Sequence, residues 1–382
     1  MNDLRRIVIP EFMIGRGARF NAGGYALNLG AKKVLLVTDE NVQKAGHVED
    51  IAGLLSETGV DYVIYDRITP NPKDYEVSDG AELYINSKCD CIIAVGGGSP
   101  IDCAKGIAIL ATNGGNISDY EGVDMIPEPI PPMICIPTTA GTSADVSQFA
   151  IITNSKLKYK MAIISKMVVP DVALIDAETL TTMDAHLTAT TGMDALTHAI
   201  EALVSTASCT FTDIHAIDAI RLIINYLPKC LQYPENLDFR TEVMRASLEA
   251  GIAFSNASLG AVHAIAHSLG GFLDLPHGEC NAVLLPHIIK HNFPHNIEKY
   301  IMLARAFGFT GDVTDIKSAS EFVIDKINNL NKEVGITRNI SQMGVKLSDI
   351  ATLSEKAFND PCMITNPVEM SINDITEVFE NA

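Results

Sequence analysis

The sequence predicts an α/β domain with a parallel sheet at residues 1–183 and an all-helical domain at residues 184–382. In the first part, short runs rich in β-branched residues alternate with helical stretches, which is typical of parallel strands joined by helices. After about residue 183 these runs end and Ala/Leu-rich helical patterns dominate. Three prolines are expected to break those helices: Pro228, Pro276 and Pro294. A chain of 382 residues is long enough for two hydrophobic cores.

The expected strands cover residues 34–37, 62–65, 91–95 and 133–136, and a hairpin over residues 148–164 is expected to turn at Asn154 and Ser155. Asp39 follows the first of these strands. A carboxylate at that point can accept hydrogen bonds from an adenosine ribose and repels a 2'-phosphate, which favours NAD over NADP. The sequence is equally compatible with Asp39 as the cap of the next turn.

A glycine-rich turn follows the strand at 91–95. It reads Gly96-Gly97-Gly98, and Ser99 as N-cap with Pro100 at the first helical position is expected to open a helix. Glycines let a backbone approach a phosphate, and the first N–H groups of a helix attract it. The strand at 133–136 leads into a second loop of small and hydroxyl-bearing residues, 137–145. Two such loops after neighbouring strands predict a pyrophosphate clamp.

The helical part contains a group of metal-ligand residue types. Asp194 and His198 are four residues apart, as are His263 and His267, and His277 follows in a turn. An i,i+4 spacing places both side chains on one helix face. A lone His in an apolar helix is usually a packed core residue, but four His and one Asp in this arrangement, in a chain of ten His, favour a metal site. Four of the five would complete a tetrahedral shell.

The ligand types indicate a catalytic metal rather than a structural one. Structural zinc sites are rich in thiolates, whereas Cys280 is the only cysteine near the group and has no CxxC partner. Carboxylate and imidazole ligands suit Fe(II), Zn or a similar ion with an open coordination position.

Composition excludes several classes of function. The formal net charge is -19, which opposes binding to nucleic acids or anionic membranes. The eight cysteines lie mostly in apolar runs and are expected to be reduced thiols, which indicates the cytoplasm. No signal-peptide core follows Arg5 and Arg6, and no apolar run approaches the ~20 residues of a membrane span.

Several motifs together resemble the iron-containing, or group III, alcohol dehydrogenases, and the resemblance covers nearly the whole chain. The motifs are Gly96-Gly97-Gly98-Ser99-Pro100-Ile101-Asp102-Cys103-Ala104-Lys105, Gly192-Met193-Asp194-Ala195-Leu196-Thr197-His198-Ala199-Ile200-Glu201, His263-Ala264-Ile265-Ala266-His267 and Pro276-His277-Gly278. One departure is visible. The family usually reads Gly-Thr-Gly-Ser-Glu where this chain has Gly141-Thr142-Ser143-Ala144-Asp145, and the lost glycine restricts the backbone of that loop.

The resemblance implies a role for each matching residue. The metal ligands would be Asp194, His198, His263 and His277, with His267 just outside the shell as a proton relay or a substrate-orienting residue. The cofactor-binding residues would be Asp39, Asn71, Gly97, Gly98, Ser99, Thr138, Thr139, Thr142 and Lys160. Phe254 and Cys362 would line the substrate pocket. The resemblance also implies Fe(2+) as the metal, with Zn, Ni or Mg possible, NAD as the cofactor, and a homodimer.

The function expected is hydride transfer between NAD(H) and a small uncharged alcohol or aldehyde, in a cleft between the two domains. Segments 190–202 and 260–282 contain no Lys or Arg, so they offer no clamp for a carboxylate or phosphate. A metal held by one carboxylate and three imidazoles would bind the alcohol oxygen and lower its pKa. The alternatives are polyol oxidation as in glycerol dehydrogenase, a dehydroquinate synthase-like lyase, a metal-dependent hydrolase and a non-catalytic nucleotide sensor.

Overall fold

The computed structural model describes residues 4–382, which form two compact units, the first ending at Thr182 and the second spanning Met183–Ala382. The first unit is built on a six-stranded sheet in the order β1-β9-β6-β4-β2-β3, and every neighbouring pair is parallel. Its strands are β1 (Glu11–Ile14), β2 (Lys33–Val37), β3 (Asp61–Tyr65), β4 (Cys91–Gly96), β6 (Met133–Pro137) and β9 (Val172–Ile175). The predicted parallel sheet is therefore confirmed.

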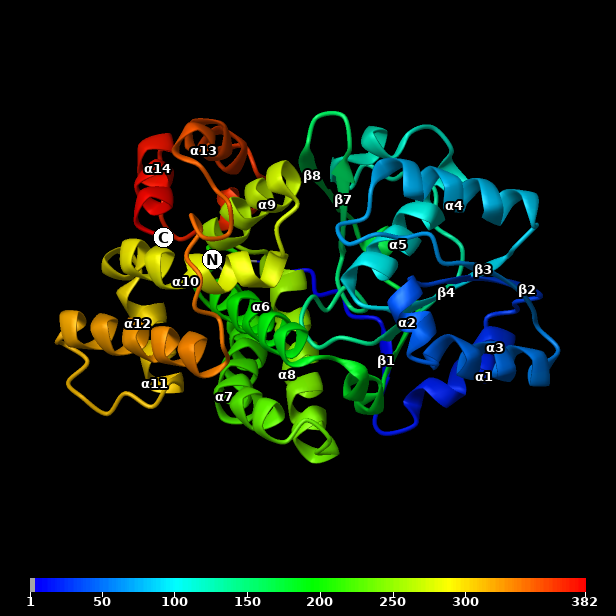
Figure 1. Cartoon of the computed structure of the whole chain (residues 1–382), viewed down its shortest axis with the longest axis horizontal. Coiled ribbons are helices and arrows are strands. Elements are labelled where there is room, and N and C mark those ends of the chain that lie inside the picture. Colours follow the sequence, from blue (N-terminus) through cyan, green and yellow to red (C-terminus); the bar gives the residue numbers. More distant parts are fainter. Residues whose placement is uncertain (1–3) are drawn as a thin grey trace. The chain divides into compact units, whose positions relative to one another are not determined.

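Alternate side chains of each strand serve hydrophobic cores on opposite faces of the sheet. Leu35 and Ile92 belong to one core, and Val34 and Ile93 belong to the other, as the two-residue period of a strand requires. Helices α4 and α5 cover the first face, and α1 and α3 cover the second (Figure 1). The helices of this unit are α1 (Ala22–Asn28), α2 (Glu40–Lys44), α3 (His47–Thr58), α4 (Asp74–Asn86) and α5 (Gly98–Asn113).

Strands β6, β4 and β2 are consecutive neighbours near the middle of the sheet. Val37 of β2 is paired with Ala94 of β4, and Gly96 of β4 is paired with Pro137 of β6. Because the strands are parallel, the segments that follow them leave from one edge of the sheet. Ligands of open α/β sheets bind at this carboxyl edge, so the fold gathers the predicted cofactor loops there.

Helix α5 begins earlier than the sequence predicts. Its first residue is Gly98 and its N-cap residue is Gly97, so the prediction of Ser99 as N-cap is wrong. Gly97 has an extended backbone, with φ -79 and ψ -160, and the helix starts at the next residue. Ser99 therefore lies in the first helical turn.

A small three-stranded sheet of order β5-β8-β7 accompanies the main one. It consists of β5 (Gly122–Val123), β7 (Phe149–Asn154) and β8 (Tyr159–Ile164). Strands β7 and β8 form the predicted antiparallel hairpin. The turn occupies residues 155–158 rather than Asn154 and Ser155, because Asn154 ends the strand and its Oδ1 accepts hydrogen bonds from the N–H groups of Lys156 and Leu157.

The second unit is helical, as predicted. Its helices are α6 (Ala185–Val204), α7 (Thr210–Gln232), α8 (Leu237–Ala257), α9 (Ala261–Leu273), α10 (His277–Asn292), α11 (Ile297–Ala306), α12 (Ile316–Glu333), α13 (Ile350–Phe358) and α14 (Ile372–Asn381). Pro276 is the N-cap residue of α10, and Pro294 lies in a short 3-10 turn. Pro228 does not break a helix, since it lies within α7, whose last turns are held by the buried side chains of Leu227 and Cys230.

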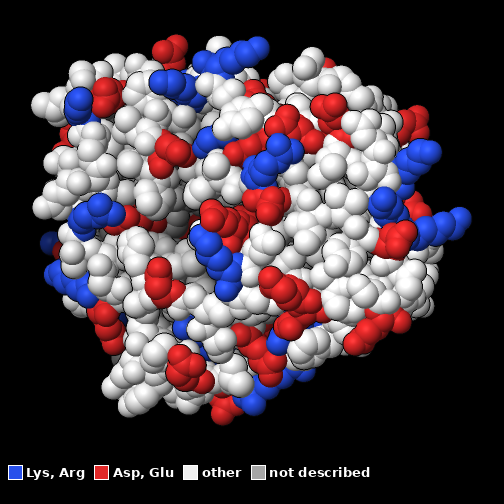
Figure 2. Space-filling model, turned by 45° about the vertical axis from the view of Figure 1, so that its right-hand side comes forward, with Lys and Arg blue, Asp and Glu red and all other residues white. Residues whose placement is uncertain are grey.

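The surface charge is mixed. Acidic and basic side chains alternate over the face drawn in Figure 2, and that face has no continuous basic area of the kind that binds nucleic acids. None of the helices in residues 4–382 is long and apolar enough to cross a membrane.

Candidate active site

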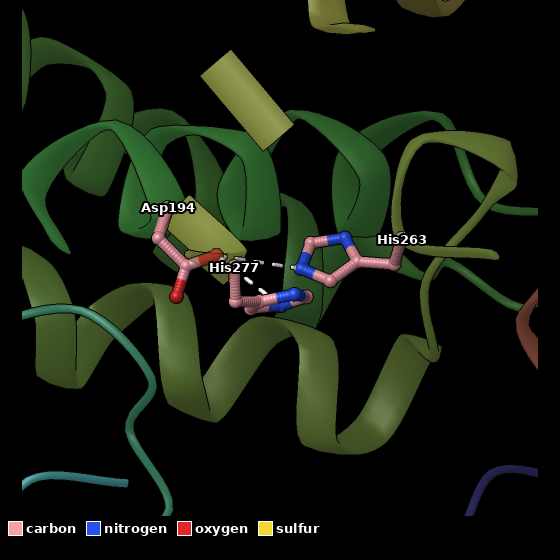
Figure 3. A group of neighbouring side chains, drawn as sticks. All are labelled: Asp194, His263 and His277. Carbon is pink, nitrogen blue, oxygen red and sulfur yellow. Dashed lines mark ion pairs between the residues drawn. The ribbon is translucent and has the colours of Figure 1, made fainter. Parts of the chain in front are cut away.

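Three of the predicted metal ligands converge in the second unit. The Oδ1 atom of Asp194 lies 3.7 Å from Nε2 of His263 and 3.7 Å from Nε2 of His277 (Figure 3). Asp194 belongs to α6, His263 to α9, and His277 is the first residue of α10. Their ligand atoms all lie within 4.8 Å of one another. Two atoms that share one ion with bonds of about 2.0–2.2 Å lie at most about 4.4 Å apart, and both 3.7 Å separations from Asp194 are within that limit.

The local sequence brings α10 close to α6. A Cβ atom on Gly278 would lie 2.3 Å from the backbone oxygen of Thr190 and 3.3 Å from Cβ of Asp194. No residue with a side chain fits at such a contact. The glycine after His277 therefore allows the start of α10 to approach Asp194.

His198 and Phe254 lie against this group. The His198 ring stacks on His263 at 4.5 Å and on Phe254 at 4.3 Å, measured between ring centroids. Both side chains are buried. The helical i,i+4 spacing thus places His198 beside the other three predicted ligands.

Glu201 is a site residue that sequence reasoning missed. Its Oε2 atom lies 2.6 Å from Nδ1 of His263 and accepts the N–H of Gly260 at 3.0 Å, while Oε1 accepts the N–H of Val262 at 2.7 Å. The carboxylate therefore caps the N-terminus of α9 and holds the Nδ1 proton of His263, which leaves Nε2 for a metal. Metal-bound histidines are commonly oriented by a carboxylate in this way.

The electrostatics of the site favour a bound cation. Burial opposes ionisation of Asp194, but His198 and His277 outweigh it and hold the pKa of that carboxyl well below its usual value. Burial also opposes a charge on His263, but the nearby carboxylates of Asp194 and Glu201 raise the pKa of the imidazole to about 9. A carboxylate and imidazoles that attract positive charge in a buried site fit a divalent cation.

His267 and Cys362 are joined by a second carboxylate that the sequence did not reveal. Nδ1 of His267 lies 2.9 Å from Oδ2 of Asp360, and Oδ1 of Asp360 accepts the backbone N–H of Cys362 at 2.8 Å. All three residues are buried, and burial raises the pKa of the Cys362 thiol well above its usual value. The His267 ring also stacks on His277 at 5.3 Å.

The two predicted cofactor loops of the first unit are in contact. A Cβ atom on Gly97 would lie 3.1 Å from the Thr139 side chain, and one on Gly98 would lie 2.7 Å from the Thr142 side chain. A side chain at Gly98 would therefore clash with the second loop, and one at Gly97 would fit only tightly. Thr138 joins the same contact, since its N–H donates to the carbonyl oxygen of Gly96 at 2.9 Å.

Other predicted cofactor residues lie at or near this edge. The backbone N–H of Asn71 donates to Oγ of Ser99 at 3.2 Å. Oδ1 of Asp39 accepts the N–H groups of Asn41 and Val42, so Asp39 caps α2. That is the simpler of the two roles that the sequence allowed, and it leaves the ribose contact as a prediction.

Lys160 lies on β8, and its charge influences Asp102 in the first turns of α5. Loss of solvation raises the pKa of the Asp102 carboxyl to about 7, and Lys105 and Lys160 oppose that rise.

Ser143, which replaces the usual family glycine, adopts φ 49. The loop therefore keeps a left-handed backbone that glycine would adopt without strain.

Comparisons with known proteins extend over both units. The family model described as "Iron-containing alcohol dehydrogenase" matches residues 10–177, and "Fe-containing alcohol dehydrogenase family, C-terminal" matches residues 188–382. The chain is 39% identical to the NAD-dependent methanol dehydrogenase of Bacillus methanolicus over 373 residues, 98% of both chains. It is 43% identical to the 1,3-propanediol dehydrogenase of Citrobacter freundii over 356 residues, 93% of this chain and 92% of the relative.

The fold comparison agrees. The solved structure of an alcohol dehydrogenase from Oenococcus oeni matches with a TM-score of 0.96 at 37% identity, over 99% of this chain and 100% of that one. These similarities do not favour the alternatives of glycerol dehydrogenase-like polyol oxidation or a metal-dependent hydrolase.

Proposed function

Because the chain belongs to the iron-containing alcohol dehydrogenase family, an oxidoreductase family, we propose that it interconverts small uncharged alcohols and aldehydes with NAD(H) and one divalent cation, Fe(2+). The observation that supports this proposal most directly is the convergence of Asp194, His263 and His277 within 4.8 Å of one another. A hydrolase or a nucleotide sensor would not need both this group and the glycine-rich loops of the first unit.

Four residues would hold the cation: Asp194, His198, His263 and His277. When bound, the cation supplies the positive charge that polarises an alcohol or carbonyl oxygen. Glu201 holds the proton of His263 on Nδ1. The lone pair on Nε2 is then available to the cation. The same donor types accept Zn, Ni or Mg, so the ion found in a purified sample depends on availability.

For the cofactor, Gly97, Gly98 and Ser99 would hold the pyrophosphate at the start of α5, where the N–H groups of the first turn point outward from the helix. Asp39 would face the adenosine ribose and disfavour a 2'-phosphate. Both capping bonds of Asp39 use Oδ1, so the cap and a ribose contact through the other carboxylate oxygen are compatible. The name of the Bacillus methanolicus relative also states NAD dependence.

His267 would carry the proton to solvent, because an imidazole can both accept and donate a proton. Asp360 accepts from His267 at Nδ1 and so fixes the orientation of the ring. Phe254 and Cys362 would line the substrate pocket. The absence of Lys and Arg from 190–202 and 260–282 supports an uncharged substrate.

We further propose a homodimer in a reducing compartment such as the cytoplasm. All eight cysteines are free thiols, and seven of them are buried, which suits a reducing environment. The dimer rests on family resemblance, and light scattering of the purified protein would measure it directly.

The enzyme activity is tested by mixing the purified protein with NAD or NADP and a panel of short alcohols, and by recording NADH or NADPH formation. We expect NAD to be preferred, activity to disappear after chelation, and Fe(2+) to restore it. Turnover that is unaffected by chelation, or the absence of reduced cofactor with every alcohol, would refute the proposal.

A further inference from the structure

Asn281 lies among the ligand atoms of the metal site, although no sequence pattern assigned it a role. It follows His277 by four residues on α10, and its side chain is fully buried. Its Nδ2 atom lies 2.6 Å from Oδ1 of Asp194, 3.1 Å from Nε2 of His263 and 3.2 Å from Nε2 of His277. An amide NH2 group has two hydrogens, so it cannot donate to all three of these atoms at once.

The other end of the same amide is unsatisfied. The Oδ1 atom of Asn281 is buried and has no hydrogen-bond partner among residues 4–382. A buried acceptor without a partner is destabilising. The NH2 group of Asn281 therefore faces three acceptor atoms at once, whereas its own acceptor, Oδ1, has no partner among the described residues.

A cation at this site would favour the oxygen of the Asn281 amide, rather than its nitrogen, on the side of the ligand atoms. A neutral imidazole nitrogen has one lone pair, so His263 Nε2 cannot bind a metal and accept an N–H at the same time. A half-turn about the last side-chain bond of Asn281 exchanges nitrogen and oxygen with little change in shape. The oxygen would then lie where Nδ2 lies now, 2.6–3.2 Å from the three ligand atoms. Ligand atoms around one divalent ion are spaced in this range.

We propose that Asn281 is a further metal-binding residue, whose amide oxygen faces the cation together with Asp194 and the histidines. The inference rests on the proposed metal role of Asp194, His263 and His277. An amide oxygen is a hard donor of the kind that Mg, Mn and Fe(II) accept. Zinc usually completes its shell with four donors. Asn281 should therefore favour Fe(II) and Mn(II) over Zn(II).

The test measures the affinity of the purified protein for Mn(II) and for Zn(II) by competition with a chelator of known affinity. Asn281→Leu keeps the size of the side chain and removes the oxygen, so Mn(II) affinity should fall at least ~10-fold, and Zn(II) affinity should fall less. Asn281→Asp keeps an oxygen donor and should retain Mn(II) binding.

Asn331→Leu is the matched control. Asn331 is also buried, its Nδ2 donates to the carbonyl oxygen of Ala282 at 2.7 Å, and its Oδ1 likewise has no partner among the described residues. This variant should leave metal affinity within threefold of wild type. If Asn281→Leu does not fold, as judged by circular dichroism, Asn281→Ala replaces it with the same expected loss.

Two outcomes would overturn the inference. One is unchanged or tighter Mn(II) binding by the folded Asn281→Leu or Asn281→Ala protein, which would make the amide a bystander or a competitor of the metal. The other is an Asn281→Asp protein that loses Mn(II) as strongly as Asn281→Leu. If either result is obtained while His263→Ala still loses its metal, the role of Asn281 is rejected and the proposed metal site is retained. A wild-type protein that binds no divalent cation would instead reject the proposed function.

Discussion

Glu201→Gln tests whether the Glu201 carboxylate orients His263 as a ligand of the proposed metal site. Glu201 accepts three close hydrogen bonds, two through Oε2 from Gly260 and His263 and one through Oε1 from Val262. Glutamine has one oxygen. Its NH2 group must replace either Oε1 or Oε2, so at least one of these buried N–H groups loses its acceptor.

The magnitude follows from these contacts. A hydrogen bond to a charged group contributes about 1.5–3 kcal/mol, and the negative charge near the N-terminus of α9 adds up to about 1 kcal/mol. We therefore expect the free energy of unfolding to fall by about 2–3 kcal/mol. Loss of an orienting carboxylate lowers metal affinity by about 10–100-fold.

The assay combines urea unfolding of the second unit with a chelator competition for the bound metal. Glu355→Gln is the matched control, because Glu355 is exposed on α13 of the same unit. The control should leave both quantities unchanged. Metal affinity within threefold of wild type in a folded Glu201→Gln protein would refute the reasoning that Glu201 sets the tautomer of His263.

Three further predictions concern single residues. Ser143→Gly should raise the free energy of unfolding by about 0.5–1 kcal/mol, seen as a higher melting temperature, because glycine adopts the observed φ of 49 without strain; an unchanged or lower value would contradict this. Burial raises the pKa of Asp145 to about 6, above about 3.9 in an unfolded chain, so its contribution to stability is full below pH 4 and is lost as the pH rises through 6. Asp145→Asn has no carboxyl to titrate, so its free energy of unfolding in urea, relative to wild type, should be about 1–3 kcal/mol higher at pH 8 than at pH 4. The same difference between the two proteins at both pH values would count against this prediction. His267→Ala should lower turnover roughly 10²-fold while metal stays bound; metal analysis that shows the ion lost would make His267 a ligand, and near-normal turnover would leave it a structural residue.

In the first unit, we assign cofactor binding to strands and loops that were largely predictable from the sequence. The apolar run at 91–95 followed by three glycines has few other interpretations, and the structure places β4 and α5 there. Strands β1 and β9, of four residues each, were not predicted. They lie beside each other in the sheet, where tertiary pairing rather than local pattern defines them.

Most residues of the proposed metal site could be named from the sequence because helical spacing brings them onto shared faces. Asp194 and His198 lie on α6, and Glu201 follows by three residues on the same helix. A glutamate at that point is usually a solvated residue, so its buried contact with His263 could not be expected from the sequence.

Longer-range contacts were beyond the reach of local patterns. Asp360 lies 93 residues from His267 along the chain, and no spacing rule links the two. Asn281 has helical spacing from His277, but its approach to Asp194 depends on how α10 packs against α6. The Gly278 contact with Thr190 sets that packing.

The most direct test of the account is the metal content of His263→Ala, measured by mass spectrometry on the same sample as NADH formation from an alcohol. We expect about one divalent ion per wild-type chain and, in the variant, loss of most of the metal together with the activity. His295→Ala, a change at an exposed histidine, should retain both. A folded His263→Ala protein with full metal occupancy and normal turnover would contradict the assignment of the site.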